Sequence, residues 1–192
     1  MIEMLTREMR MVDIQIVNNL LRNTTFFAST TILILAGLAA SFGAADTFVM
    51  VTTDLPFVQE TTRAAWEIKI LLLIFIFIYA FFKFSWSIRL HSYTAVLLGA
   101  APGPPADGAV LSQNDLSYAR ELGRVSTLAA DHFNNGIRAY YFGLAAVTWF
   151  VHPMLVFAAT VWVLIVLYRR EFRSRSLRHL IGAKSARDSG AV

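Results

Sequence analysis

The side chains that could carry chemistry in this sequence are ionisable and amide groups at the edges of long apolar runs. Lys83 directly follows the uninterrupted apolar run of residues 70–82, and a second apolar stretch begins at residue 139. Leading up to this second stretch, four polar residues share one face of the expected helix. They are Arg124, Asp131, Asn134 and Arg138, at spacings of seven, three and four residues. Charged and amide groups at the mouth of a membrane span are expensive unless they are paired or hydrated.

These residues predict a polar cluster near the cytoplasmic face of a membrane. Its members are Arg22, Lys83, Asp131, Asn134 and Arg138. Asp131 and Arg138 are two helical turns apart, so each needs a partner elsewhere, and Lys83 and Asp13 are the candidates. A structural clamp is the favoured role, and an ion or substrate site is the alternative. For Lys83, snorkelling of its long stem to the headgroups is a further alternative.

Neither the histidines nor any motif predicts a cofactor or a catalytic centre. His91 and His132 fall on the predicted cytoplasmic side, His152 on the other side and His179 in the C-terminal tail. A haem between membrane helices needs two histidines at similar depth on facing helices, so we expect no haem and no metal. The chain has no cysteine and none of the HExxH, GxSxG or P-loop patterns. We therefore expect a protein that is not an enzyme.

The composition identifies the environment of these residues. Of 192 residues, 56% are hydrophobic and 16% are charged, and the mean hydropathy is +0.54. Soluble domains carry about 25% charged residues, so the composition excludes a soluble enzyme domain, a disordered chain and a disulfide scaffold. The pI of about 9.7 reflects basic residues beside apolar runs. This placement favours membrane topology and anionic-lipid contact at the C-terminal basic segment over nucleic-acid binding.

The apolar runs predict an all-α integral membrane protein with four transmembrane helices in a bundle. A span needs about 20 mostly apolar residues. The predicted spans are residues 26–48, 66–88, 133–151 and 154–168. The last two form a hairpin that turns at His152-Pro153, since proline removes a backbone donor. The second and third helices extend beyond the membrane into the cytoplasm.

Two further segments flank this transmembrane domain of residues 25–170. Residues 1–24 carry apolar side chains three or four apart, which predicts an amphipathic helix that lies on the membrane or continues into the first span. Residues 171–192 form a basic C-terminal tail. The predicted domains are therefore 1–24, 25–170 and 171–192.

The first predicted span also has a face of polar and small residues. Its members, at helical spacing, are Asn18, Arg22, Thr25, Ser29, Ala36, Ala40 and Gly43. Small residues let helices approach closely in lipid, so this face is favoured to pack inside the bundle. The alternative is that the face lines a polar cavity or pore.

The distribution of basic residues predicts the orientation. Fifteen lysines and arginines lie in the two termini and the middle loop, against two, Arg63 and Lys69, on the other side. Both termini and the middle loop should therefore be cytoplasmic.

Several strings resemble a known family. They are LLRNTTFFASTTILILAGL, FFKFSWSIRLHSYTAVLLGA, HFNNGIRAYYFGLAAVTWFVHP and LYRREFRSR. In this order they resemble the domain of unknown function 599 (DUF599) family of bacterial and plant membrane proteins, over about residues 6–178. The resemblance implies a four-span protein of the bacterial inner membrane without an assigned activity. The family's recurrent segments coincide with Arg22, Asn23, Lys83, Arg89, Asn134, Arg138 and Tyr140.

Two functional hypotheses follow. The first is a structural or interaction subunit that oligomerises or attaches to a larger membrane complex. The alternative is a homo-oligomeric channel or transporter, in which the polar first-helix face surrounds an axis with a basic cytoplasmic mouth. Four short spans are too few to enclose a pathway, so the channel requires several copies.

Overall fold

The computed structural model describes residues 4–5, 10–53, 62–103 and 111–172, and all regular structure in these ranges is helical. In chain order the elements are α1 (Met11–Gly43), α2 (Ala45–Thr53), α3 (Arg63–Gly99), α4 (Gln113–Val147), the 3-10 helix η2 (Thr148–Phe150) and α5 (Pro153–Phe172). The predicted all-α membrane fold is confirmed. α1, α3 and α4 each span about 50 Å at 1.5 Å per residue, so they are longer than a bilayer core of about 30 Å.

α1 is one continuous helix of 33 residues. The sequence pattern leaves open whether the segment before residue 25 lies on the membrane or continues into the first span. Of the two alternatives for the N-terminal segment, the structure has the one in which the helix continues into the apolar run. No glycine or proline interrupts the chain between Met11 and Leu35, and this explains the continuity.

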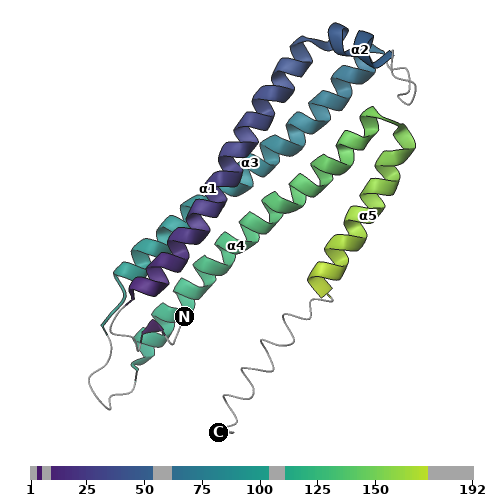
Figure 1. Ribbon diagram of the computed structural model, residues 1–192. Helices are drawn as coiled ribbons and strands as arrows, with labels where there is room; N and C mark the ends of the chain where they lie inside the picture. Colours follow the sequence, from purple (N-terminus) through teal and green to yellow (C-terminus); the bar gives the residue numbers. More distant parts are fainter. Residues whose placement is uncertain (1–3, 6–9, 54–61, 104–110, 173–192) are drawn as a thin grey trace.

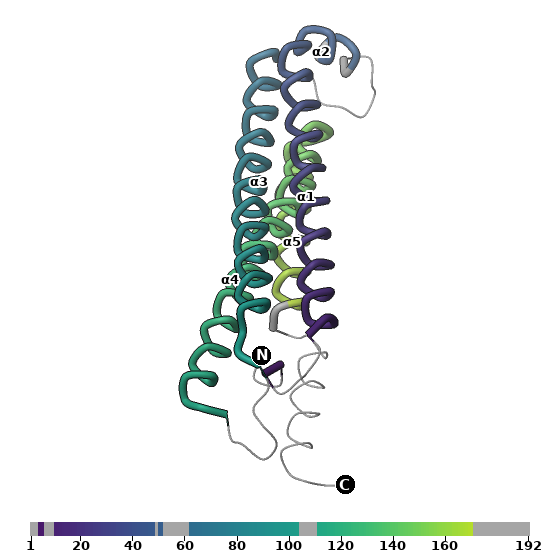
Figure 2. Tube along the Cα trace, turned by 90° about the vertical axis from the view of Figure 1, so that its left-hand side faces the viewer, coloured from purple at the N-terminus to yellow at the C-terminus, as the bar shows by residue number. Residues whose placement is uncertain are grey.

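α3 is the centre of the fold and packs along both α1 and α4 (Figures 1 and 2). Its buried side chains recur every three or four residues, as in Leu73, Phe77, Ala80 and Phe84. At one end of the molecule, Met4 and Leu5 join Val17, Leu98, Ala119 and Leu122 in a separate apolar cluster. The three helices therefore form a continuous core that extends beyond the apolar spans.

Two glycines of α4 set the close approach of α3 and α4. A Cβ at Gly136 would lie 2.5 Å from Cε1 of Phe84, and one at Gly143 would lie 2.9 Å from Cζ of Phe77. Gly136 and Gly143 are two turns apart, as are Phe77 and Phe84, so the same contact is made twice along the seam. Small residues allow this approach in a membrane, where no hydrophobic effect drives helices together.

α5 folds back from α4 through η2 and is the least packed helix (Figure 1). Among its residues with described side chains, none is buried, whereas α3 buries twelve. Pro153 begins the helix, a position where the missing backbone N–H has no intrahelical partner to lose.

Three helices are long and apolar enough to cross a membrane: α1, α3 and α5. They indicate a membrane protein. α4 is a further long helix whose first half, from Gln113, is rich in polar residues. The fourth span therefore stays a prediction. The predicted basic tail falls mostly on residues 173–192, outside the described residues, while α5 continues to Phe172.

Candidate anion site at the basic end of the bundle

The apolar stretches of α3, α4 and α5 each end at a basic residue, and the three basic residues lie at a similar position along the length of the bundle. Phe84, next to Lys83, packs against Gly136 of α4. Tyr141, one turn along from Arg138, contacts Arg170, which lies near the end of α5. Lys83, Arg138 and Arg170 therefore lie near one plane across the bundle, and we call these three residues the basic rim.

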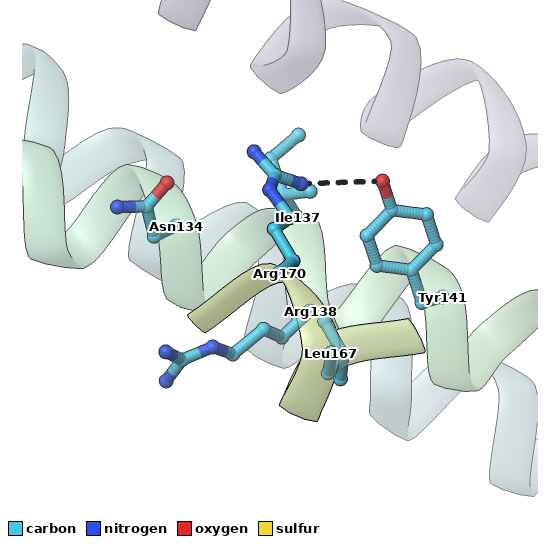
Figure 3. A pocket seen from close by; sticks show the side chains of 6 residues that line it. All are labelled: Asn134, Ile137, Arg138, Tyr141, Leu167 and Arg170. Carbon is cyan, nitrogen blue, oxygen red and sulfur yellow. Dashed lines mark hydrogen bonds between the residues drawn. The ribbon is translucent and has the colours of Figure 1, made fainter. Parts of the chain in front are cut away.

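A cavity lies between α4 and α5 at this level (Figure 3). It has a volume of about 200 Å³ and is lined by Asn134, Ile137, Arg138, Tyr141, Leu167 and Arg170. Nη1 of Arg170 donates a long hydrogen bond of 3.4 Å to the hydroxyl of Tyr141. Nη1 of Arg138 donates to Oδ1 of Asn135 at 3.1 Å. Two arginines from two helices thus line one cavity, and Figure 3 shows their guanidinium groups extending in different directions, that of Arg170 toward Tyr141.

Lys83 lies on the α3 side of the rim. Its Nζ is 5.2 Å from the centre of the Tyr79 ring, one turn earlier on α3. Burial and the positive charge of Lys83 lower the pKa of His132, against the opposing effect of Asp131. Nδ1 of His132 is buried and has no hydrogen-bond partner among the described residues. Lys83 and His132 are therefore neighbours across the α3–α4 seam.

The structure assembles only part of the predicted five-residue cluster. Asn134 and Arg138 line the same cavity, as predicted for neighbours on one stripe. Asp131 is exposed, and its carboxylate makes no ion pair with Lys83 within the described ranges. Arg22 is exposed on α1, in a shallow groove lined only by α1 residues. Arg170 was absent from the prediction, although the pair Arg169-Arg170 at the end of an apolar run was a usable signal.

A family model described as Protein of unknown function, DUF599 matches residues 1–176. The chain belongs to the DUF599 family. No curated protein and no solved structure matches it. The match confirms the resemblance seen in the sequence, and it covers every residue of the basic rim.

In the DUF599 chain, the polar and small face of α1 points away from the bundle. All seven of its members, from Asn18 to Gly43, are exposed. The interpretation of this face as packing inside the bundle is therefore wrong for the single chain. α1 instead buries Val17, Thr24, Ala28 and Thr31. These residues form a stripe at spacings of seven, four and three, which is also helical and was not singled out in the sequence.

The threonines of that buried stripe are satisfied locally, so burying them costs little. Thr24 and Thr31 donate their hydroxyl protons to the carbonyls four residues earlier, Leu20 and Phe27, at 2.8 and 2.7 Å. The hydroxyl of Tyr140 lies 2.8 Å from Oγ1 of Thr31 and links α4 to α1. On α3, the buried hydroxyl of Ser87 is instead satisfied by another helix, since it donates to the carbonyl of Ala129 in α4 at 2.7 Å.

The opposite end of the bundle is built differently. Arg63 is exposed and forms ion pairs of 2.8 Å with Asp46 and Glu67. Lys69 is only 8% exposed. Its Nζ lies 5.7 and 5.6 Å from the ring centres of Trp149 and Phe150, which belong to η2 and so join η2 to α3. These aromatic contacts anchor the hairpin.

No part of the described chain brings together three or more His, Asp or Glu side chains that could hold a metal ion. The α4–α5 cavity gathers two arginines, a tyrosine and an asparagine. Their N–H and O–H groups are donors, which suits the binding of an oxyanion.

Proposed function

We propose that this DUF599 protein is a non-catalytic assembly subunit of the bacterial inner membrane, with both termini in the cytoplasm. It packs α1 against a neighbouring transmembrane helix, which belongs either to a second copy of the chain or to a larger membrane complex. The observation that carries the proposal is the outward direction of the small-residue face of α1. The DUF599 family itself carries no activity from which a function could be transferred.

The geometry of this face is suited to helix–helix contact. Ala36 and Ala40 are exposed, and a Cβ added at Gly43 would meet no atom within 4 Å. Small residues spaced four apart let two helix backbones approach closely in lipid, where packing and interhelical hydrogen bonds drive association. Within the chain, Gly136 and Gly143 are already filled by phenylalanine rings. The exposed small residues of the α1 face, Ala36, Ala40 and Gly43, offer the same kind of contact to another chain.

The depth of this face agrees with a contact inside the membrane. Phe27 of α1 stacks on Phe84 of α3 with ring centres 5.6 Å apart. Nearer the opposite end, Leu38 packs with Ile70 and Trp66. The part of α1 between Phe27 and Leu38 therefore runs beside the apolar run of α3. The polar members of the face, Asn18 and Arg22, lie beyond Phe27 toward the basic end.

Native mass spectrometry of the mildly extracted protein tests the proposal. A mass at a multiple of 21.5 kDa indicates a homo-oligomer, and additional subunits indicate a larger complex. In either case Ala40→Leu should dissociate the assembly, because the larger side chain separates the helices. Phe157→Leu is the matched control on the exposed surface of α5. A protein that is monomeric in its native membrane extract contradicts the proposal.

The absence of cysteine from the sequence allows a second test. An Ala40→Cys variant in native membranes should form a crosslinked dimer if two copies meet at α1. The Phe157→Cys variant should not form one at the same rate. Equal crosslinking at both positions would indicate random collision and contradict a specific α1 contact.

One observation favours the channel as a second candidate. The groove on the outside of α1 is lined by polar side chains toward the basic end, namely Asn18, Arg22, Thr25 and Ser29. An oligomer that turned these groups toward an axis would favour anions. Anion flux into vesicles that is lost in Arg22→Ala would support the channel. Absence of flux under any gradient would eliminate it.

A further inference from the structure

We propose that the cavity between α4 and α5 binds a phosphate-bearing anion, supplied by a membrane lipid headgroup at the depth of the basic rim. This inference goes beyond the assembly function. It concerns a different face of the molecule, so it can be tested independently of the α1 contact.

The donors in the cavity suit an oxyanion. Arg138 and Arg170 reach it from different helices, and Arg side chains form bidentate hydrogen bonds with phosphate oxygens. The hydroxyl of Tyr141 accepts a hydrogen bond from Arg170, which leaves its own proton to donate. The side-chain amide of Asn134 adds a further donor on the same wall (Figure 3).

The size of the cavity also suits a phosphate group. Its volume is about 200 Å³, while a water molecule occupies about 30 Å³ in the liquid. Ile137 and Leu167 make part of the cavity lining apolar. A lipid could therefore place its phosphate beside a guanidinium group and its glycerol and chains along these apolar side chains.

The position of the cavity distinguishes it from an ordinary surface arginine pair. It lies where the apolar run of α5, a membrane-spanning candidate over Pro153–Arg170, ends. It opens between α4 and α5, which diverge from their hairpin toward this end (Figure 1). Basic pockets between transmembrane helices at the membrane surface are sites for anionic headgroups. In the sequence, residues 169–178 contain five arginines, Arg170 among them, and one glutamate.

The test uses the full chain in lipid-free detergent, with lipid added back. Phosphatidylglycerol and phosphatidylcholine are titrated separately, and bound lipid is counted by native mass spectrometry. We expect phosphatidylglycerol to bind at least about tenfold more tightly, because each arginine near the surface contributes about 1 kcal/mol toward anionic lipid. The double variant Arg138→Gln/Arg170→Gln should lose this preference.

The matched control is Arg124→Gln, which removes the same charge from an exposed site on α4 that pairs with Glu121. It should retain the preference for phosphatidylglycerol. The conservative variant Arg170→Lys keeps the charge but not the guanidinium fork, and should bind the lipid several-fold more weakly while remaining folded. It keeps the test decisive if the double variant does not fold.

Inorganic phosphate separates the two sources of the ligand. If millimolar phosphate raises the thermal unfolding midpoint of the wild type but not of Arg170→Lys, and phosphatidylglycerol shows no preference, the cavity binds a free anion and the lipid assignment is overturned. If Arg124→Gln loses binding as much as the cavity variants, the attraction is a general surface charge effect and the site is refuted. Failure of these tests leaves the α1 contact, which is measured by mass and crosslinking, unaffected.

Discussion

α4 makes two very different seams with its two neighbours. Along α3, Gly136 and Gly143 receive Phe84 and Phe77 so closely that a methyl group at either glycine would overlap a ring. Along α5, no residue of the partner helix with a described side chain is buried, and a cavity separates the two helices at the basic end. One seam is specified by shape, while the other is held by its hairpin and a long polar contact between Arg170 and Tyr141.

The contrast shows what selects the residues of each helix. α3 needs particular side chains at particular positions, because its neighbours leave no room for others. α5 is under less constraint from the rest of the chain, because none of its described side chains is buried. The close α3–α4 contact therefore determines the fold, and the looser α4–α5 contact leaves space for a ligand. Substitutions on the two seams should differ accordingly in their effects.

The largest effect is expected at Gly136. In Gly136→Leu, the side chain would overlap the buried ring of Phe84, which is 0% exposed and has no free space to move into. Overpacking a close seam costs about 1–3 kcal/mol or more, a large part of the stability of a small protein. We expect loss of monodisperse protein in size-exclusion chromatography after extraction.

Gly37→Ala is the control for this substitution. The same kind of residue in the same kind of helix is replaced, but the new Cβ meets no atom within 4 Å. Alanine is favoured over glycine in a helix by about 1 kcal/mol, so the variant should be at least as stable as the wild type. Equal loss in both variants would show that backbone effects, and not the contact with Phe84, control stability.

A smaller effect is expected at Gly143. Its Cβ would lie 2.9 and 3.1 Å from atoms of Phe77, so the ring must shift by a few tenths of an ångström. Gly143→Ala should lower the free energy of unfolding by about 1 kcal/mol, measured as a lower thermal unfolding midpoint. An unchanged midpoint would mean that the seam tolerates expansion at this end, and the contrast with α5 would be weaker.

The polar link from α4 to α1 ranks next. Tyr140→Phe removes a hydroxyl that lies 2.8 Å from Thr31 and 3.3 Å from the carbonyl of Phe27. Removal of one such hydrogen bond costs about 0.5–1.5 kcal/mol. In a double-mutant cycle with Thr31→Val, the two effects should not add, because both variants remove the same bond. Additive effects would show that the two hydroxyls contribute separately.

These features were accessible from the sequence to different degrees. The helical fold and the apolar runs follow from composition and helical spacing, and the structure confirms the all-α membrane class. The inward face of α1 did not follow, because Thr24 and Thr31 are polar by residue type and become suitable for burial only through bonds to their own helix. Sequence spacing marks a face, but it does not say whether the face points toward the chain or away from it.

The candidate site shows the same limit. Asn134 and Arg138 could be grouped from one helix, since residues four apart share a face. Arg170 could not be joined to them without the return angle of α5, which depends on the tertiary contacts of the hairpin. Asp131 shares a helical stripe with Asn134 and Arg138, and Arg22 is grouped with them as a basic residue on the same predicted side of the membrane, but the structure leaves both exposed and apart from the cavity. To predict which residues on different helices meet, one must know how far each helix is shifted along its neighbour. The hydropathy pattern does not supply this shift.

The smallest effect is expected on α5. Trp162 is 70% exposed, so Trp162→Leu removes little contact within the chain and exchanges one apolar side chain for another toward lipid. The thermal unfolding midpoint of the isolated chain should change by less than the equivalent of about 0.5 kcal/mol. Buried Phe84→Leu, on the close seam, is the comparison, with an expected cost of about 1–3 kcal/mol. If Trp162→Leu lowers the midpoint only in material extracted as an assembly, α5 contacts a protein partner. A large loss in the isolated chain would mean that the α4–α5 seam is closed in solution, and the contrast between the two seams would fail.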